Sequence, residues 1–338
     1  MLSRVAESLY WMARYIERAE AVSRLAAVDF QAQLDGARSG GWEDVVAITS
    51  DPELFRSLCP ERDERSALRF LFTHASNPNG VLTTLSRARE NARSVRDQIS
   101  SEVWEHLNRL YLLARDGSAG MADEPYAFFL RVRAGSQAFE GITAATMTHG
   151  EAFQFIQLGR FLERAATTVR TLAVRYQEVR SFEEGTAASS LGLMTLLKSC
   201  SAFEPYQRQH ASQLQARLVA EYLLLSPQFP RAVLFCLQRA AQALEAVSPP
   251  PVRATDRLDT PGRLLGRLLA DLSYLDTGAG LEEGLPSLLD HLVRKIHVVG
   301  NEITRSYFNT RVILPHSVDV PSAQQQQQQQ QQQMRFER

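Results

Sequence analysis

The chain has 338 residues, of which 44% are hydrophobic, and its 37 basic and 38 acidic side chains give a formal net charge of −1. This length allows one large domain or two ordinary ones, each with a sizeable core. The charge balance lacks the basic excess that is typical of general nucleic-acid-binding proteins. No run of about 18 uncharged apolar residues occurs, so we expect neither a membrane span nor a signal peptide.

Almost every periodic segment has apolar residues three or four positions apart, which is the spacing of one face of an α-helix. No segment alternates apolar and polar residues over the length of a strand, so the predicted fold class is all-α. In chain order, helices are predicted over residues 4–35, 42–48, 62–74, 78–99 and 103–114. The next helix begins at about residue 125, and the second long helix follows it and ends near residue 179. The last predicted helices cover residues 190–202, 206–225, 230–247, 261–275 and 286–307.

Local signals mark several of these helix starts. Asn77-Pro78 and Thr260-Pro261 are typical of an N-cap followed by proline at the first helical position. Phe229-Pro230 is expected to begin a helix at the same place in its own segment. Thr148 and Glu151 predict a capping box, in which the threonine oxygen accepts the amide of residue 151 and the glutamate reaches back. This box would begin the second long helix, which ends near residue 179.

A charged motif occurs twice in the chain. Residues 14–19 read Arg-Tyr-Ile-Glu-Arg-Ala, and residues 160–165, which lie 146 positions later, read Arg-Phe-Leu-Glu-Arg-Ala. A second match, at an offset of 152, aligns residues 77–82 with residues 229–234. Self-similarity of this kind indicates repeated structure. The sequence therefore predicts a helical bundle built from two tandem helical repeats that are related by a pseudo-two-fold axis.

The predicted domain organisation follows from this duplication. We expect a first helical repeat over residues 1–145 and a second over 146–315, which pack together as one compact domain. Three consecutive prolines at 249–251 predict a stiff linker inside the second repeat. The unbroken glutamine run at 324–333 has too little apolar surface to form a core. Residues 316–338 are therefore expected to be a disordered, glutamine-rich tail.

The repeated motif supplies the strongest candidate site. On a helix, Arg14, Glu17 and Arg18 share one face, so Glu17 is expected to lie between two guanidinium groups. The second copy supplies the equivalent residues Arg160, Glu163 and Arg164. Three interpretations stay open: interhelix salt bridges that fix how the halves meet, a cleft whose arginines bind an anionic ligand, and acid–base catalysis by a glutamate. Flanking arginines lower the pKa of a carboxyl group, which suits an anchor better than a proton donor.

A second charged segment follows one face of the helix predicted after Pro78. Its candidate residues are Arg89, Glu90, Asn91 and Arg93. A solvated, salt-bridged helix face is the default interpretation, and ligand contacts by the asparagine amide are the alternative.

Motifs for metal, phosphate-loop or cofactor binding do not occur, so the sequence predicts neither a metal nor a cofactor and leaves open whether the protein is an enzyme. The cysteines, Cys59, Cys200 and Cys236, are far apart in the sequence, which favours core or loop thiols in a reduced, cytoplasmic compartment.

Taken together, these motifs resemble the bacterial alpha-E family, which is named for a predicted α-helical domain with a recurring ER motif. The resemblance covers about residues 1–315. It rests on the opening Met-Leu-Ser-Arg-Val-Ala-Glu-Ser-Leu-Tyr-Trp, on both charged repeats, on Ala-Arg-Glu-Asn-Ala-Arg at 88–93 and on Phe-Pro-Arg at 229–231. The glutamine run departs from the family. Residues 148–151 match it more loosely, which argues against a ligand role for His149.

The resemblance implies a soluble bacterial protein without an established activity. Genes of this family tend to lie beside, or to be fused to, an ATP-grasp-type ligase, often together with a transglutaminase-like protease. We therefore expect an accessory or interaction protein of a peptide- or amide-bond-forming system, which docks the ligase and presents its substrate. The alternatives are an enzyme or binding protein with an arginine-rich cleft for a carboxylate- or phosphate-bearing ligand, and a homodimeric structural protein without a ligand.

Overall fold

The fold is all-α throughout the part of the chain that the structure describes, which confirms the predicted fold class. The structure is a computed structural model, and the described residues are 1–35, 41–121, 123–183, 185–210, 213–248, 260–275 and 281–308. Residues Met1–Phe308 form one compact unit. The predicted linker at 249–251 and the predicted tail at 316–338 lie outside the described residues.

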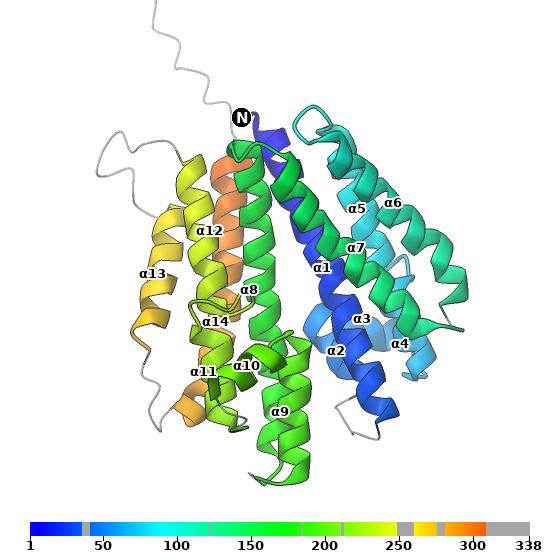
Figure 1. Ribbon diagram of the computed structural model, residues 1–338, viewed down its shortest axis with the longest axis vertical. Helices are drawn as coiled ribbons and strands as arrows, with labels where there is room; N and C mark the ends of the chain where they lie inside the picture. Colours follow the sequence, from blue (N-terminus) through cyan, green and yellow to red (C-terminus); the bar gives the residue numbers. More distant parts are fainter. Residues whose placement is uncertain are drawn as a thin grey trace, which may run out of the picture. The chain divides into compact units, whose positions relative to one another are not determined.

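Two long helices, α1 (Ser3–Leu34) and α8 (Glu151–Arg180), lie side by side at the centre (Figure 1). One group of helices packs beside α1 and a second group beside α8. The first group comprises α5 (Val81–Ser94), α6 (Ser101–Gly117) and α7 (Pro125–Thr146). The second comprises α12 (Val233–Val247), α13 (Pro261–Ser273) and α14 (Leu281–Ile303).

Shorter helices pack around the half of this arrangement that lies away from the start of α1 (Figure 1). They are α2 (Trp42–Thr49), α3 (Pro52–Leu58), α4 (Glu64–Phe72), α9 (Ala187–Ser199), α10 (Phe203–His210) and α11 (Ala216–Leu225). The chain also forms a 3-10 turn at Ser118–Gly120 and a π-helical turn at Thr304–Phe308. Of the shorter helices, α3 has no counterpart among the predicted helices. The predicted helix 206–225 is wrong as a single element. Tyr206 donates a hydrogen bond from its hydroxyl to the carbonyl of Gln213 at 2.6 Å, in the break between α10 and α11.

Apolar side chains form two buried clusters that meet along α1. The first half of α1, with Leu9 and Ile16, packs into a cluster with α8, α12, α13 and α14. The second half, with Leu25, packs into a cluster with α2, α4 and α7. Each fully buried leucine or isoleucine contributes about 1.5–3 kcal/mol. Residues of α1 belong to both apolar clusters, so the position of α1 against α8 determines how the two clusters are placed next to each other.

The predicted helix start at Asn77-Pro78 is wrong by a few residues. The helix α5 begins at Val81, and Asn77 is buried in the turn before it. The Asn77 amide donates to the carbonyl of Phe70 at 2.9 Å, and its oxygen accepts the amide of Asn79 at 3.0 Å. The side chain therefore closes a turn between α4 and α5 and does not cap a helix. The helix also ends at Ser94, earlier than the predicted residue 99.

Of the other proline-based starts, those at Pro125 and Pro261 are confirmed, and those at Pro230 and Pro286 are wrong. Pro230 precedes α12, which begins at Val233, so Arg231 lies in a turn. The carbonyl of Arg231 accepts the Thr168 hydroxyl of α8 at 2.9 Å. Pro286 lies inside α14 and does not begin it. The helix α13 does begin at Pro261, as predicted, although Thr260 makes no side-chain capping bond.

The predicted capping box at Thr148 and Glu151 is also wrong. The helix α8 begins at Glu151 with Gly150 at the N-cap position and no side-chain capping bond. Thr148 lies two residues before the N-cap, so its oxygen is not placed to accept an amide of the first turn. The Glu151 carboxylate instead accepts a hydrogen bond from the amino group of Met1 at 3.0 Å. This ion pair connects the beginnings of α1 and α8.

The two central helices approach each other closely at Gly159. A Cβ atom added to Gly159 would lie 2.3 Å from the carbonyl oxygen of Tyr10 and 3.3 Å from the Cγ of Arg14. A real side chain does not tolerate the first distance, and the obstacle is backbone. Gly159 therefore permits the close packing of α1 and α8, which brings Arg14 within reach of the next turn of α8.

We expect Gly159→Ala to lower the free energy of unfolding by about 1–3 kcal/mol, because the helices must move apart to admit the methyl group. Gly141→Ala is the matched control, since a Cβ at this position of α7 meets no atom within 4 Å. That control should be stabilising by about 0.5–1 kcal/mol, the usual gain of alanine over glycine in a helix. Urea unfolding measures both, and a neutral Gly159→Ala would contradict the close approach.

Candidate functional site

The two ER segments exchange their ionic partners. Glu163 of α8 accepts from Arg14 Nε and Arg18 Nε of α1, each at 2.7 Å. Glu17 of α1 accepts from Arg164 Nε at 2.7 Å and Arg164 Nη2 at 2.9 Å. The expectation that Glu17 lies between the arginines of its own helix is therefore wrong. Because α1 and α8 pack face to face, each carboxylate meets guanidinium groups of the opposite helix.

On one side of the helix pair, three arginines surround one carboxylate. This Glu163 cluster consists of Arg14, Arg18, Glu163 and Arg170. Glu163 has only 1% of its side chain exposed, and Arg170 Nη2 lies 3.7 Å from its Oε1. Arg170 Nε donates to the carbonyl of Ile48 at the end of α2, at 2.9 Å. The cluster thereby connects α1, α8 and α2.

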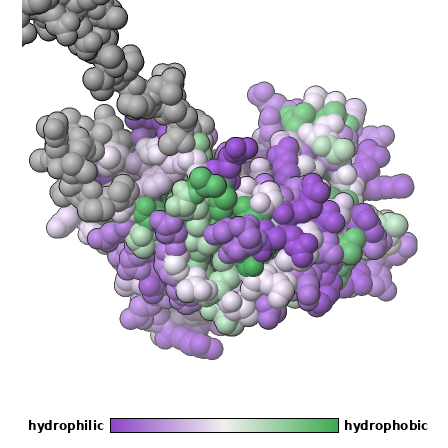
Figure 2. Space-filling model, turned by 90° about the horizontal axis from the view of Figure 1, so that it is seen from above, coloured by the Kyte–Doolittle hydropathy of each residue, from purple (hydrophilic) through white to green (hydrophobic). Residues whose placement is uncertain are grey.

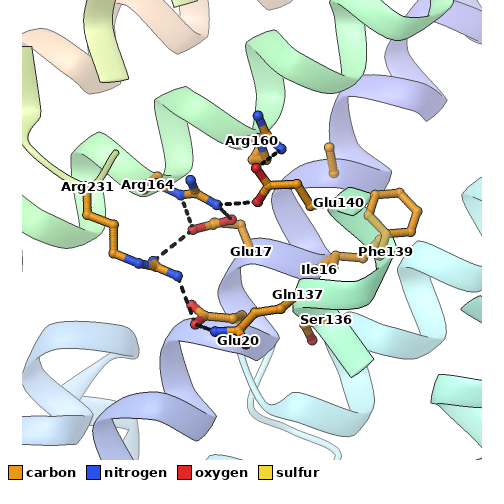
Figure 3. Close-up of a pocket in the computed structure, with 11 residues that line it drawn as sticks. Ile16, Glu17, Glu20, Ser136, Gln137, Phe139, Glu140, Arg160, Arg164 and Arg231 are labelled. Carbon is orange, nitrogen blue, oxygen red and sulfur yellow. Dashed lines mark hydrogen bonds and ion pairs between the residues drawn. The ribbon is translucent and has the colours of Figure 1, made fainter. Parts of the chain in front are cut away.

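On the other side, a larger set of charges surrounds Glu17 (Figure 3). This Glu17 cluster consists of Glu17, Glu20, Arg24, Glu140, Arg160, Arg164 and Arg231. Arg231 joins two turns of α1, because its Nη1 lies 3.2 Å from Glu17 and its Nη2 lies 2.9 Å from Glu20. Arg164 also reaches Glu140 of α7 at 3.1 Å. The cluster thus ties α1, α7, α8 and the turn before α12 together.

The arginines hold two of these carboxylates, Glu20 and Glu163, in the ionised form. Burial alone raises the pKa of Glu20, but Arg231, Arg24 and Arg164 outweigh it and lower the pKa to about 2. Burial likewise raises the pKa of Glu163, and Arg18 and Arg14 more than offset it, so that this pKa lies far below its ordinary value. Neither group can donate a proton at neutral pH. General acid catalysis by these two glutamates is therefore not supported.

The space inside the Glu17 cluster is small. Its cavity has a volume of about 20 Å³, bounded by α1, α7, α8 and Arg231. That is room for one water molecule, whereas sites for organic ligands typically measure about 300–1,000 Å³. Ser136 Oγ and Arg160 Nε border this cavity and are buried, and neither has a protein hydrogen-bond partner among the described residues. An organic substrate does not fit between these side chains.

Comparison with known proteins places this paired-helix arrangement in a family. A family model described as "a predicted alpha-helical domain with a conserved ER motif" matches residues 1–308. The chain belongs to the Alpha-E family. The structure explains why such a motif needs both residue types, because each glutamate of one ER segment is held by an arginine of the other.

Relatives of this Alpha-E chain include an uncharacterised protein of Mycobacterium bovis and uncharacterised proteins from two strains of Mycobacterium tuberculosis. Each is 23% identical to the chain over 344 aligned positions, and the match covers 92% of the chain. The chain spans 37% of the length of these relatives, so in them the Alpha-E region is one part of a longer protein. No solved structure shows significant similarity to the chain.

The second predicted group of site residues lies on α5 and is not part of the ER network. Arg89 Nε donates to Asn108 of α6 at 2.7 Å, and its Nη1 donates to Glu90. Arg93 forms an exposed ion pair with Glu90 at 2.6 Å. Asn91 belongs to the same helix, and its carbonyl accepts the hydroxyl of Ser94. Among the described residues, no hydrogen bond or ion pair joins this group to the ER clusters.

Sequence reasoning missed Glu140, Arg170 and Arg231 as members of the site. Arg231 follows the proline of the Phe-Pro-Arg motif, and this motif was the available signal for it. Arg170 also had a signal, since it lies 146 positions after Arg24 in the register of the duplication. Glu140 had none, because it lies in α7 outside both repeats of the motif.

Other features of this Alpha-E chain lie apart from the ER network. The three cysteines are buried free thiols, and burial raises the pKa of Cys236 to about 12, so it is not a nucleophile at neutral pH. A second cavity, of about 480 Å³, lies between the turn after α5, the end of α7 and the start of α8. Within the described ranges, no helix has the length and apolarity to cross a membrane, and no group of three or more His, Cys, Asp or Glu side chains is placed to hold a metal ion.

We expect Arg164→Met to lower the free energy of unfolding by about 3–5 kcal/mol, because it leaves the buried carboxylate of Glu17 short of its main partner. Arg93→Met is the control, since Arg93 is 65% exposed and pairs with an exposed glutamate. Such surface pairs contribute about 0–1 kcal/mol. Urea unfolding of both variants tests the difference, and equal effects would show that the Glu17 cluster contributes no more than a surface pair.

The lowered pKa of Glu20 predicts a specific dependence of stability on pH. The pKa falls from its ordinary 4.5 to about 2 on folding, so the ionised group stabilises the fold fully above about pH 5 and loses this contribution as the pH falls through about 2. We therefore expect Glu20→Gln to be less stable than the wild type at pH 7, with a difference that shrinks between pH 4.5 and pH 2. Thermal unfolding across this range measures it, and a constant difference would contradict the assignment.

Proposed function

We propose that this chain is a non-catalytic accessory domain of a peptide- or amide-bond-forming system, in which it docks an ATP-grasp-type ligase and presents the ligase's substrate. One observation carries the non-catalytic part of this proposal. The acidic groups in and next to the ER motif form ion pairs with arginines, and the cavity beside them has a volume of about 20 Å³. The motif therefore serves to hold helices together, and the function is assigned to the surface of the bundle.

The length of the relatives supports a role beside other protein parts. The match covers 37% of each mycobacterial relative, so the Alpha-E region there is covalently joined to further chain. A domain that works next to a partner within one chain needs a contact surface for it. The choice of an ATP-grasp-type ligase as that partner, with a transglutaminase-like protease as a second one, rests on the family resemblance of the sequence.

One end of the bundle offers a surface of suitable character. At the end where α1 begins, hydrophobic residues gather in the middle of the visible face and hydrophilic residues border them (Figure 2). Leu2 and Met1, at the start of α1, are 77% and 44% exposed. Exposed apolar patches with a polar border are typical of protein interaction sites. We assign the docking of the ligase to this end.

The tandem duplication is the second part of this proposal. Arg18 pairs with Glu163, and Arg164 pairs with Glu17. Arg18 and Arg164 are 146 positions apart, and so are Glu17 and Glu163. Each ion pair therefore joins the arginine of one copy of the motif to the glutamate of the other copy. We infer two helical repeats, over residues 1–145 and from 146 onward, that were once identical and that pack as one body. The reciprocal pairs support this inference.

We expect the chain to form a complex with the ATP-grasp-type ligase of the same organism at micromolar concentrations, measured by mass photometry and co-purification. Leu2→Asp should raise the dissociation constant at least tenfold, since it puts a charge on the exposed apolar start of α1. Tyr274→Asp is the matched control, because Tyr274 is 89% exposed after α13, away from the start of α1. The absence of a complex would contradict docking, and a complex insensitive to Leu2→Asp would contradict the assigned face.

A further inference from the structure

The Glu163 cluster has an excess of positive charge. Arg14, Arg18 and Arg170 all contact the carboxylate of Glu163. Among the described residues, this is the one carboxylate with which these three arginines form ion pairs. The Glu17 cluster differs, because its four arginines are matched by three glutamates. The chain as a whole is nearly neutral, with a formal net charge of −1. The excess is therefore local to one side of the central helix pair.

The three guanidinium groups are held in fixed positions. Arg14 Nη1 donates to the hydroxyl of the buried Tyr10 at 3.0 Å, and the guanidinium lies 4.7 Å from the centre of the Trp11 ring. Arg18 Nη1 donates to the side-chain oxygen of Asn79 at 3.1 Å. Arg170 is fixed to the end of α2 by its bond to a carbonyl. A ligand that binds such groups loses little free energy in ordering them.

These groups also remain accessible to solvent. The side chains of Arg14, Arg18 and Arg170 are 17%, 21% and 33% exposed, while Glu163 behind them is 1% exposed. Each guanidinium has five N–H donors, and the bonds described here occupy only part of them. Arg87, which is exposed on α5, adds a further positive charge near this side, 5.8 Å from the centre of the Tyr15 ring. Each of the three guanidinium groups therefore keeps N–H donors that these bonds do not use.

We propose that Arg14, Arg18 and Arg170, together with the amide of Asn79, bind an oxyanion, namely the carboxylate or phosphate group of a small ligand, on the outer side of Glu163. Planar guanidinium groups suit such ligands because two parallel N–H donors match two oxygens. Glu163 holds the arginines in position and is not itself a ligand-binding group. This site does not depend on the proposed docking of a ligase, because it is tested on the isolated chain.

Titration of the full-length chain with inorganic phosphate and, separately, with succinate tests the proposal, with sodium chloride at equal ionic strength as the reference. We expect one of the two anions, or both, to bind with one-to-one stoichiometry in isothermal titration calorimetry and to raise the melting temperature in a saturable way. Binding of phosphate alone identifies a phosphate ligand, and binding of succinate alone identifies a carboxylate. If neither phosphate nor succinate raises the melting temperature or releases binding heat beyond the effect of sodium chloride, the proposal is overturned.

Two matched variants locate the site. Arg170→Gln should weaken binding of the anion at least tenfold, because it removes a charge and a donor from the Glu163 cluster. Arg160→Gln should leave binding unchanged, because Arg160 lies on the other side of the helix pair, where its partner is Glu140 at 2.6 Å. Equal affinities of the two variants would overturn the assignment.

Glu163→Gln supplies a readout that remains informative if the arginine variants do not fold. It removes the one opposing carboxylate, so the cluster should bind the anion more tightly than in the wild type. Saturating phosphate or succinate should then raise the melting temperature of Glu163→Gln more than that of the wild type. If the anion raises both equally, or raises neither, the three arginines are not a binding site.

Discussion

The structure depends on the exchange of ion pairs between α1 and α8. A carboxylate buried between two helices is costly unless guanidinium groups meet it with good geometry. Glu17 and Glu163 each satisfy this condition with arginines of the opposite helix, and Arg231 and Arg170, respectively, add a further contact. This pairing favours one register of the two helices, because a shift by one turn would separate Arg164 from Glu17 and Arg18 from Glu163. Gly159 allows the close approach that this register requires.

The same pairing limits what the ER motif can do chemically. A carboxylate whose pKa is lowered far below its ordinary value, as that of Glu163 is, has no proton to give to a substrate at neutral pH. The arginines of this pairing outnumber the carboxylates that they contact. The two sides of the helix pair differ in this respect. The Glu17 cluster is close to charge balance around a small cavity, whereas the Glu163 cluster has three arginines for one glutamate and is reached by solvent.

These properties fit a domain that works beside other protein parts. In the mycobacterial relatives the matched region is 37% of a longer chain. Arg231 illustrates how the ion pairing between α1 and α8 is extended. It lies in the turn before α12, and its guanidinium spans Glu17 and Glu20 of α1, so the second group of helices is tied to the first helix of the chain.

The sequence by itself determined the helical class, the central pair of long helices and the residue types of the ER network, because apolar spacing and a repeated charged motif are local patterns. Only the tertiary structure decided the partners. Glu17 has arginines three positions before and one position after it in its own helix, yet it pairs with Arg164 and Arg231, since side chains on the packed face of a helix point to the neighbouring helix. Helix starts at Asn77-Pro78 and Phe229-Pro230 failed for a similar reason. The Asn77 amide donates to Phe70 and Ser50, and the Thr168 hydroxyl donates to the Arg231 carbonyl, so these segments form turns. Pairing across a helix interface depends on register and distance in space, and neither is contained in local spacing.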